Sequence, residues 1–162
     1  MSNIRQVLSI IAAGIGVFVI VGMVILAVLA RVVKAPATLG VRDGRLSPCP
    51  ASPNCVSTFE QDERHGIASI PFTTSAAEAR ERLLRVLGSM ARTRIITAEP
   101  AYIHVEFHIG GIMGYVDDVE FYFDEGAHVI HFRSASRLPY WDWGVNRERM
   151  EAVRRALETE GV

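Results

Sequence analysis

The sequence predicts an α+β protein in which an N-terminal transmembrane helix precedes a two-layer sandwich of an antiparallel sheet, of about four strands, with two helices on one face. Three observations predict this fold. An uncharged apolar run opens the chain, two later segments carry apolar residues at helical spacing, and several segments between them alternate apolar with polar residues. We divide the chain into an N-terminal tail (1–6), a transmembrane helix (7–33), a linker (34–45) and a folded domain (46–160).

The apolar run extends from Val7 to Ala30 and contains no charged residue. At about 1.5 Å per residue this stretch forms a helix of about 36 Å, enough to cross a hydrocarbon core of about 30 Å. A cleaved signal peptide is the alternative, but its apolar region usually spans only about 7 to 15 residues. We therefore expect a single-pass anchor in the inner (cytoplasmic) membrane, with the lipid bilayer as the partner of this helix.

Two features disagree about the orientation of this helix. One basic side chain precedes the span and four follow it before residue 46, which by the positive-inside rule would place the domain in the cytoplasm. The only two cysteines, Cys49 and Cys55, favour the other side, because a disulfide persists outside the reducing cytosol. Two free thiols are an alternative, and a metal site would need more ligands than these cysteines and His65. We expect a disulfide-bonded periplasmic or extracytoplasmic domain.

The first part of the domain combines a loop with a helix. Residues 35–53 are rich in Pro, Gly and small polar residues, as is typical of a tether and loop. An extra edge strand is expected near Ile67–Ile70. The segment 74–91 predicts a helix that Thr74 or Ser75 caps, and Glu78 stands three residues after Ser75 as in a capping box. The apolar stripe of this helix consists of Ala76, Ala79, Leu83, Leu87 and Met90.

A run of strands follows this helix. Residues 92–97 form a short one, and the segments 102–109, 116–123 and 128–136 each alternate apolar with polar side chains. These three strands thus carry one apolar and one charged face. Such a pattern indicates an antiparallel meander that is covered on one side only, with its polar face in solvent.

The last helix is expected over residues 146–160, with Asn146 as its N-cap. Its apolar stripe consists of Met150, Val153 and Leu157. A cluster of aromatic residues precedes it: Tyr140, Trp141 and Trp143. These rings either pack in the core or meet the membrane interface or a partner.

Several polar residues in the second half of the domain are candidates for binding a ligand. The candidates are Asp117, Asp118, Arg133, Ser134, Ser136, Arg137, Asp142, Asn146 and Arg147. Asp117 falls on the apolar face of its strand and so needs a buried partner. Arg133 and Arg137 either balance the acidic residues of the neighbouring strands or bind a carboxylate or phosphate. Ser134 and Ser136 have no accompanying His and Asp arrangement that would make either a nucleophile.

Three segments, "CPASPNCVST", "GYVDDVEFYFD" and "RSASRLPYWDWGVNRERME", resemble the bacterial and plastid family named domain of unknown function 1499. The resemblance covers essentially the whole folded domain, and it implies a small, often membrane-attached or exported domain with no established activity. The shared positions that it implies are Pro53, Asn54, Cys55, Asp117, Asp118, Phe121, Arg133, Ser134, Ser136, Arg137, Asp142, Gly144, Asn146 and Arg147. Where relatives commonly have Gly-Tyr-Ser-Asp-Leu-Gly, this chain has the loop 139–144, "PYWDWG".

We expect six of these residues to form one network that joins the sheet, the proline-rich loop and the last helix: Asp117, Asp118, Arg133, Arg137, Asp142 and Arg147. The formal net charge of −1 gives no basic surface for nucleic acid. We expect a non-catalytic binding or accessory module without cofactor, metal or catalytic residues, whose further partner is a protein or a small anionic or apolar ligand. The alternatives are a small enzyme or anion-binding protein that uses the Asp/Arg/Ser cluster, and a carrier of a lipid or other apolar ligand.

Overall fold

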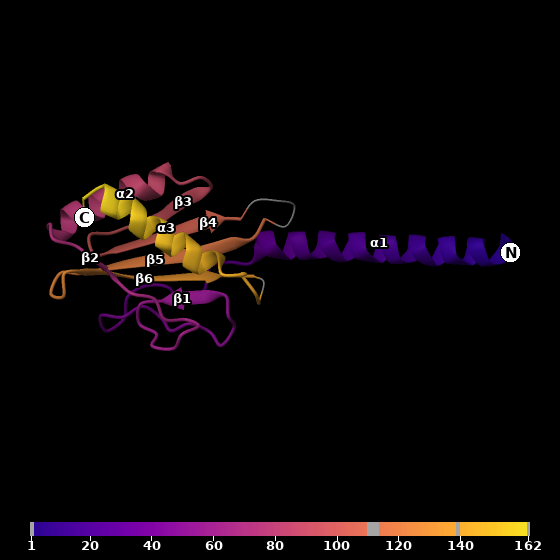
Figure 1. The fold of residues 1–162 in the computed structure, drawn as a ribbon, viewed down its shortest axis with the longest axis horizontal. Helices are drawn as coiled ribbons and strands as arrows, with labels where there is room; N and C mark the ends of the chain where they lie inside the picture. The colour runs from indigo at the N-terminus through magenta and orange to yellow at the C-terminus, as the bar shows by residue number, and fades with distance from the viewer. Residues whose placement is uncertain (1, 110–113, 139, 162) are drawn as a thin grey trace.

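The computed structural model of the protein describes residues 2–109, 114–138 and 140–161. Within these residues it confirms the predicted α+β fold. A long N-terminal helix, α1 (Ser2–Val32), projects from a domain that consists of a six-stranded sheet and two further helices (Figure 1). Pro139, the first residue of the loop that departs from the family pattern, lies outside the described residues.

Helix α1 is a candidate membrane anchor. Its stretch Asn3–Leu29 is long and apolar enough to cross a membrane, and nearly all of it is exposed in the structure. A signal sequence near the N-terminus can meet the same criteria of length and composition. The helix continues through the short polar tail that precedes the apolar run, so it begins earlier than the predicted span.

The sheet is antiparallel and has the order β1-β6-β5-β4-β3, with β2 also paired to β6. The strands are β1 (Cys55–Ser57), β2 (Ile70–Pro71), β3 (Thr93–Ala98), β4 (Tyr102–His108), β5 (Val116–Asp124) and β6 (Val129–Ser136). Strands β3 to β6 are the four predicted ones, and β2 overlaps the expected edge strand at Ile70. Strand β1 was not expected, because three residues are too few to show an alternating pattern.

Helices α2 (Ala76–Ser89) and α3 (Val145–Thr159) lie side by side on one face of the sheet (Figure 1). The buried apolar side chains of both helices form one core with those of the strands. Of the two candidate caps, Ser75 is the one that caps α2, since its hydroxyl accepts a hydrogen bond from the backbone of Glu78. The prediction that Asn146 caps α3 is wrong. Gly144 occupies that position, and Asn146 is a fully buried residue of the first turn.

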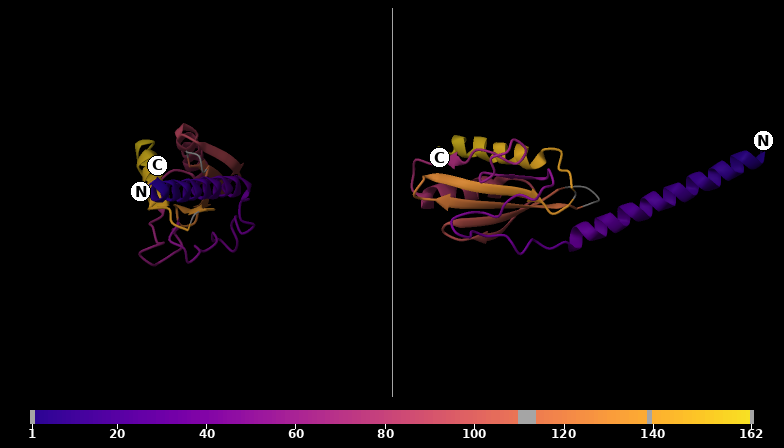
Figure 2. Two further views of the ribbon diagram at one scale, coloured as in Figure 1. Left: turned by 90° about the vertical axis from the view of Figure 1, so that its right-hand side faces the viewer. Right: turned by 90° about the horizontal axis from the view of Figure 1, so that it is seen from below.

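The opposite face of the sheet is covered as well. We call residues 33–50 the strap, because this segment leaves α1 and crosses the polar face, on the other side of the sheet from α3 (Figure 2, right). The backbone of Gly40 donates a 2.7 Å hydrogen bond to Glu120, which is fully buried. The prediction of a polar face in solvent is therefore wrong. A proline-rich segment without regular structure has no periodicity to show which surface it covers.

A disulfide joins the end of the strap to the sheet. Cys49 and Cys55 are bonded, with their Cα atoms 5.7 Å apart, and Cys55 is the first residue of β1. The expected disulfide is therefore present in the structure, in place of the two free thiols that were the alternative.

Candidate functional site

Strand β5 divides the candidate residues between the two faces of the sheet. Successive side chains of a strand point to opposite faces, so Asp117 faces the helices and its neighbour Asp118 faces the strap. On the helix side lie Asp117, Ser134, Ser136 and Asn146, and on the strap side lie Asp118, Arg133 and Arg137. The expected single network is therefore wrong. The structure brings the residues together in two separate clusters.

The helix-side cluster is centred on a buried ion pair. Asp117 accepts a 2.5 Å hydrogen bond from Arg149 of α3, and both side chains are almost fully buried. Arg149 also donates to Ser134 at 3.0 Å and to Asn146 at 2.7 Å, and its guanidinium lies 4.7 Å from the centre of the Phe107 ring. The buried partner that Asp117 was expected to need is therefore Arg149, which sequence reasoning did not single out.

Asn146 joins this cluster to two loops. Its side-chain amide donates to the carbonyl of Asn54, to the hydroxyl of Ser136 and to the carboxylate of Asp142, at 3.1, 3.0 and 2.8 Å. Asp142 also accepts from the backbone of Gly144 and of Asn146 itself, both at 3.0 Å. Asp142 therefore provides the side-chain acceptor that the glycine at the start of α3 lacks.

The strap-side cluster contains a second set of ion pairs. Arg137 donates to both oxygens of Asp118, at 2.8 and 2.7 Å, and to Glu106 at 2.6 Å, while His104 bonds Asp118 at 2.8 Å. Burial acts to raise the pKa of Asp118, but the hydrogen bonds from Arg137 and His104 together hold it below its usual range. The hydrogen bond to Asp118 likewise raises the pKa of Arg137. Both groups therefore stay charged at neutral pH.

Glu120 and Arg133 lie deeper on the same side. One carboxylate oxygen of Glu120 accepts from Gly40 of the strap and from the Tyr102 hydroxyl, at 2.7 and 2.9 Å. Burial, and then the charge of Glu120, raise the pKa of Tyr102 above its usual range, so the phenol remains a donor. Arg133 approaches the other oxygen of Glu120 at 3.5 Å.

Arg147 belongs to neither cluster. It lies on the first turn of α3 and donates hydrogen bonds to the carbonyls of Glu63, Arg64 and Gly66, at 3.3, 3.1 and 2.9 Å. Its role is to fasten the loop before β2 to the helix. In the described parts of the chain, no group of three or more His, Cys, Asp or Glu side chains could hold a metal ion.

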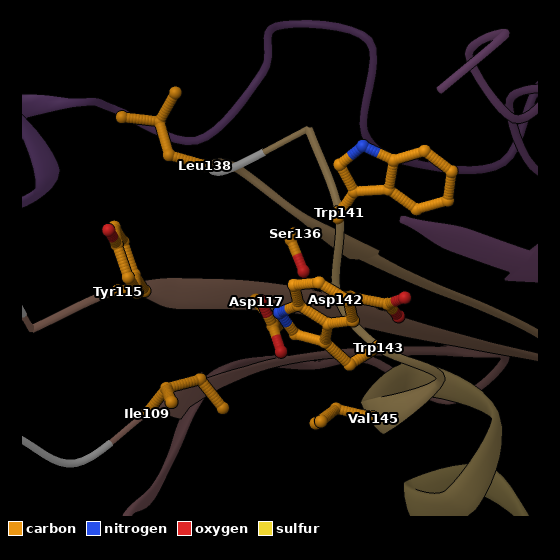
Figure 3. Close-up of a pocket in the computed structure, with 9 residues that line it drawn as sticks. All are labelled: Ile109, Tyr115, Asp117, Ser136, Leu138, Trp141, Asp142, Trp143 and Val145. Atoms are coloured by element: carbon orange, nitrogen blue, oxygen red, sulfur yellow. The ribbon is translucent and has the colours of Figure 1, made fainter. Parts of the chain in front are cut away.

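An apolar pocket of about 220 Å³ opens beside the helix-side cluster (Figure 3). Ile109, Tyr115, Leu138, Trp141, Trp143 and Val145 form its apolar wall. Asp117, Ser136 and Asp142 also line it, but carbon atoms make up almost all of the exposed wall. We call it the apolar pocket.

Three aromatic rings beside this pocket are exposed. Tyr140, Trp141 and Trp143 expose 59, 57 and 88% of their surface, and the two indoles stack with their centres 6.5 Å apart. The backbone of Trp143 has a φ of 56°, a left-handed conformation that bulky residues rarely adopt. Asp142, bonded to the start of α3, holds this turn and so keeps the Trp143 ring on the outside. Of the two alternatives for this cluster, the exposure excludes core packing.

The end of β6 and the start of α3 lie at the end of the domain from which α1 leaves (Figures 1 and 2), and Ser136 and Val145 at these two ends line the apolar pocket. Arg137, at the end of β6, donates a 3.3 Å hydrogen bond to the carbonyl of Val33, the residue after α1. The segment that carries Tyr140, Trp141 and Trp143, which we call the aromatic loop, begins three residues after Arg137. At the same end of the sheet, the backbone N–H of Ile109 donates to the carbonyl of Tyr115, and the backbone N–H of Arg137 donates to the carbonyl of Val116. The pocket and the end of α1 are therefore close neighbours.

The family is shown by a family model, described as a protein of unknown function (DUF1499), that matches residues 45–157. The chain belongs to the DUF1499 family. The match confirms the resemblance noted in the three sequence segments, and the DUF1499 region includes the residues of the apolar pocket and most residues of both clusters. No curated protein and no solved structure matches the chain.

Sequence reasoning missed several members of these DUF1499 clusters. Arg149 follows Asn146 by three residues and precedes Val153 by four, so helical spacing alone could have placed it on the buried side of α3. Tyr102 and His104 stand on the polar side of a correctly predicted strand. Nothing in the sequence pattern shows that this side is buried, because the covering strap comes from a distant part of the chain.

Proposed function

We propose that this DUF1499 protein is a membrane-anchored binding module whose apolar pocket holds the apolar part of a lipid or a similar amphiphile from the bilayer. The observation that carries this proposal is the position of the pocket. It is lined by carbon, flanked by exposed tryptophans, and located at the end of the domain where the candidate anchor leaves. A lipid or similar amphiphile in the outer leaflet of the bilayer would be the apolar ligand nearest to the mouth of this pocket.

The aromatic loop supports the same proposal. Trp and Tyr combine an apolar ring with a polar tip and are enriched at membrane interfaces. Trp143 is 88% exposed, and water is an unfavourable environment for an indole ring. Contact with the interface would remove this ring from water and bring the mouth of the apolar pocket to the lipid.

The polar residues of the pocket favour binding over catalysis. Asp117 is paired with Arg149, Asp142 is bonded to the start of α3, and the Ser136 hydroxyl accepts from Asn146. A general base needs an unengaged group within reach of a substrate proton. Each of these three groups is already committed to holding the fold.

The disulfide supports a periplasmic or extracytoplasmic domain anchored in the inner membrane by α1. Disulfides are maintained outside the reducing cytosol. Native mass spectrometry of the full-length protein, released from its own membrane in mild detergent without reductant, tests this orientation and ligand binding together. We expect a mass lower by two hydrogens than that of the reduced chain, and an additional bound lipid mass. A reduced protein would contradict the export proposal.

A quenching experiment tests the pocket itself, because Trp141 and Trp143 are the only tryptophans in the chain. The full-length protein is reconstituted into phosphatidylcholine vesicles whose acyl chains carry bromine, which quenches indole fluorescence. We expect strong quenching. Leu138→Asp places a charge in the pocket wall and should reduce it, whereas Ile96→Asp, at an apolar residue of β3 that is 43% exposed, should not. Equal quenching in both variants would rule out the pocket as the lipid site.

A further inference from the structure

The strap side of the sheet contains an arginine whose hydrogen-bonding groups are almost unused. The Arg133 side chain is 8% exposed, and its guanidinium carries five N–H donors. Its contact with Glu120 measures 3.5 Å, beyond the usual hydrogen-bond length of about 2.7 to 3.2 Å. Its Nε atom is buried and has no hydrogen-bond partner among the described residues. A buried charged group in this state is costly unless a further partner completes it.

The neighbouring Arg137, by contrast, has well-formed hydrogen bonds to its partners. Arg137 is equally buried, yet it donates hydrogen bonds to Asp118, Glu106 and the carbonyl of Val33. These bonds use the carboxylates of Asp118 and Glu106. The better-placed oxygen of Glu120 is used by Gly40 and Tyr102. The second oxygen of Glu120 lies 3.5 Å from Arg133 and has no hydrogen-bond partner among the described residues. This ion pair therefore balances the charge of Arg133 but gives its guanidinium no well-formed hydrogen bond.

Arg133 also lines an opening in the strap. A pocket of about 410 Å³ lies between the two limbs of this segment, with Pro36 and Thr38 on one limb and Pro48, Cys49 and Pro50 on the other. Arg133, Arg137, Asp118, Ala135 and Ser136 form the rest of its lining. The pocket is large enough for a small ion, and Asp118, the acidic residue in its lining, is paired with Arg137.

We propose that this pocket, which we call the strap pocket, binds a small oxyanion, a phosphate or a carboxylate, on the guanidinium of Arg133. A guanidinium pairs with two oxygens of such a group through parallel hydrogen bonds. The anion supplies acceptors closer to the guanidinium than the 3.5 Å contact with Glu120. This site lies on the strap side of the sheet, whereas the apolar pocket lies on the helix side, and Ser136 lines both pockets.

Calorimetric titration of the full-length protein in mild detergent with inorganic phosphate, and separately with acetate, tests this site. We expect one saturable site for at least one of the two anions, and the preferred anion identifies the class. Arg133→Gln should weaken the binding by on the order of tenfold or more, because it removes a charge-assisted hydrogen-bonding group. Arg94→Gln, which removes an exposed arginine from β3, is the matched control and should bind as the wild type does.

A second variant keeps the test decisive if Arg133→Gln fails to fold. Thr38 is exposed at the mouth of the strap pocket, so Thr38→Trp should block it without altering any charge. Loss of anion binding in this variant supports the site. The proposal is overturned if neither anion binds the wild type, or if both variants bind the anion as tightly as the wild type does.

Discussion

The two faces of the sheet are both buried, but by different means. On the helix side, α2 and α3 cover a continuous apolar core, interrupted at one end by the Asp117–Arg149 pair. On the strap side, a segment without regular structure covers ion pairs and hydrogen bonds. The first face depends on the fit of its side chains and the second on the matching of its charges. The two should therefore respond differently to substitution.

The largest effect is expected where one charge of the strap side loses its partner. Arg137→Met leaves Asp118 and Glu106 buried without their cation, which should lower the free energy of unfolding by about 3 to 5 kcal/mol. Urea unfolding of the full-length protein in detergent measures the change. Adding Asp118→Asn should recover part of the loss, because the unpaired charge is removed. A fully additive double variant would contradict the role that we give this pair.

A cavity on the helix side should cost somewhat less. Leu83 is fully buried in α2, and Leu83→Ala should lower the free energy of unfolding by about 3 kcal/mol. The same urea titration measures it. Combined with Arg137→Met, the two losses should add to within about 0.5 kcal/mol, because the residues lie on opposite faces and share no partner. A larger deviation would show that the faces are energetically coupled.

Opening the disulfide should weaken the strap side only. In the chain-entropy model, a closed loop of this length contributes roughly 2 kcal/mol. Cys49→Ser with Cys55→Ser should therefore destabilise the protein by about that amount. Hydrogen exchange should become faster in the strap and β1, while the amides of α2 keep their protection. Equal acceleration in α2 would mean that the strap also supports the helix side.

The smallest effect is expected from pH. Burial lowers the pKa of His131, whose ring stacks on Phe59 at 4.3 Å. Below the ordinary value of 6.5 the unfolded chain then binds more protons than the folded one, so stability falls as the pH decreases from 7 to 5. The lowered pKa of Asp118 acts only below its ordinary value of 3.8. His131→Phe should flatten the slope between pH 7 and 5, and Tyr122→Phe, which keeps the neighbouring ring, should leave it unchanged.

Sequence patterns predicted the helix side better than the strap side. The spacing of Ala79, Leu83 and Leu87 identified the buried stripe of α2, and alternation identified the strands, because regular elements repeat their environment along the chain. Alternation also showed that Asp117 would need a partner. It could not name Arg149, since that contact depends on how α3 crosses the sheet.

The strap side was predicted wrongly for a physical reason. A polar strand face looks the same in sequence whether solvent or another segment covers it. Only the number of acidic and basic residues on that face, with Glu106, Asp118 and Glu120 near Arg133 and Arg137, hinted at mutual pairing. The covering segment itself, residues 33–50, is rich in Pro, Gly and small polar residues, which specify turns and do not show which surface the segment covers.

The pairing of β1 has a consequence for the order in which the chain acquires its bonds during synthesis. Cys49 and Cys55 are six positions apart and can meet as soon as both have emerged. Strand β1 pairs with β6, whose residues are made only after β2 to β5. The disulfide loop thus has the opportunity to close while its place on the sheet does not yet exist. When β6 has been synthesised, it therefore pairs with a β1 whose first residue, Cys55, is already held in a closed loop.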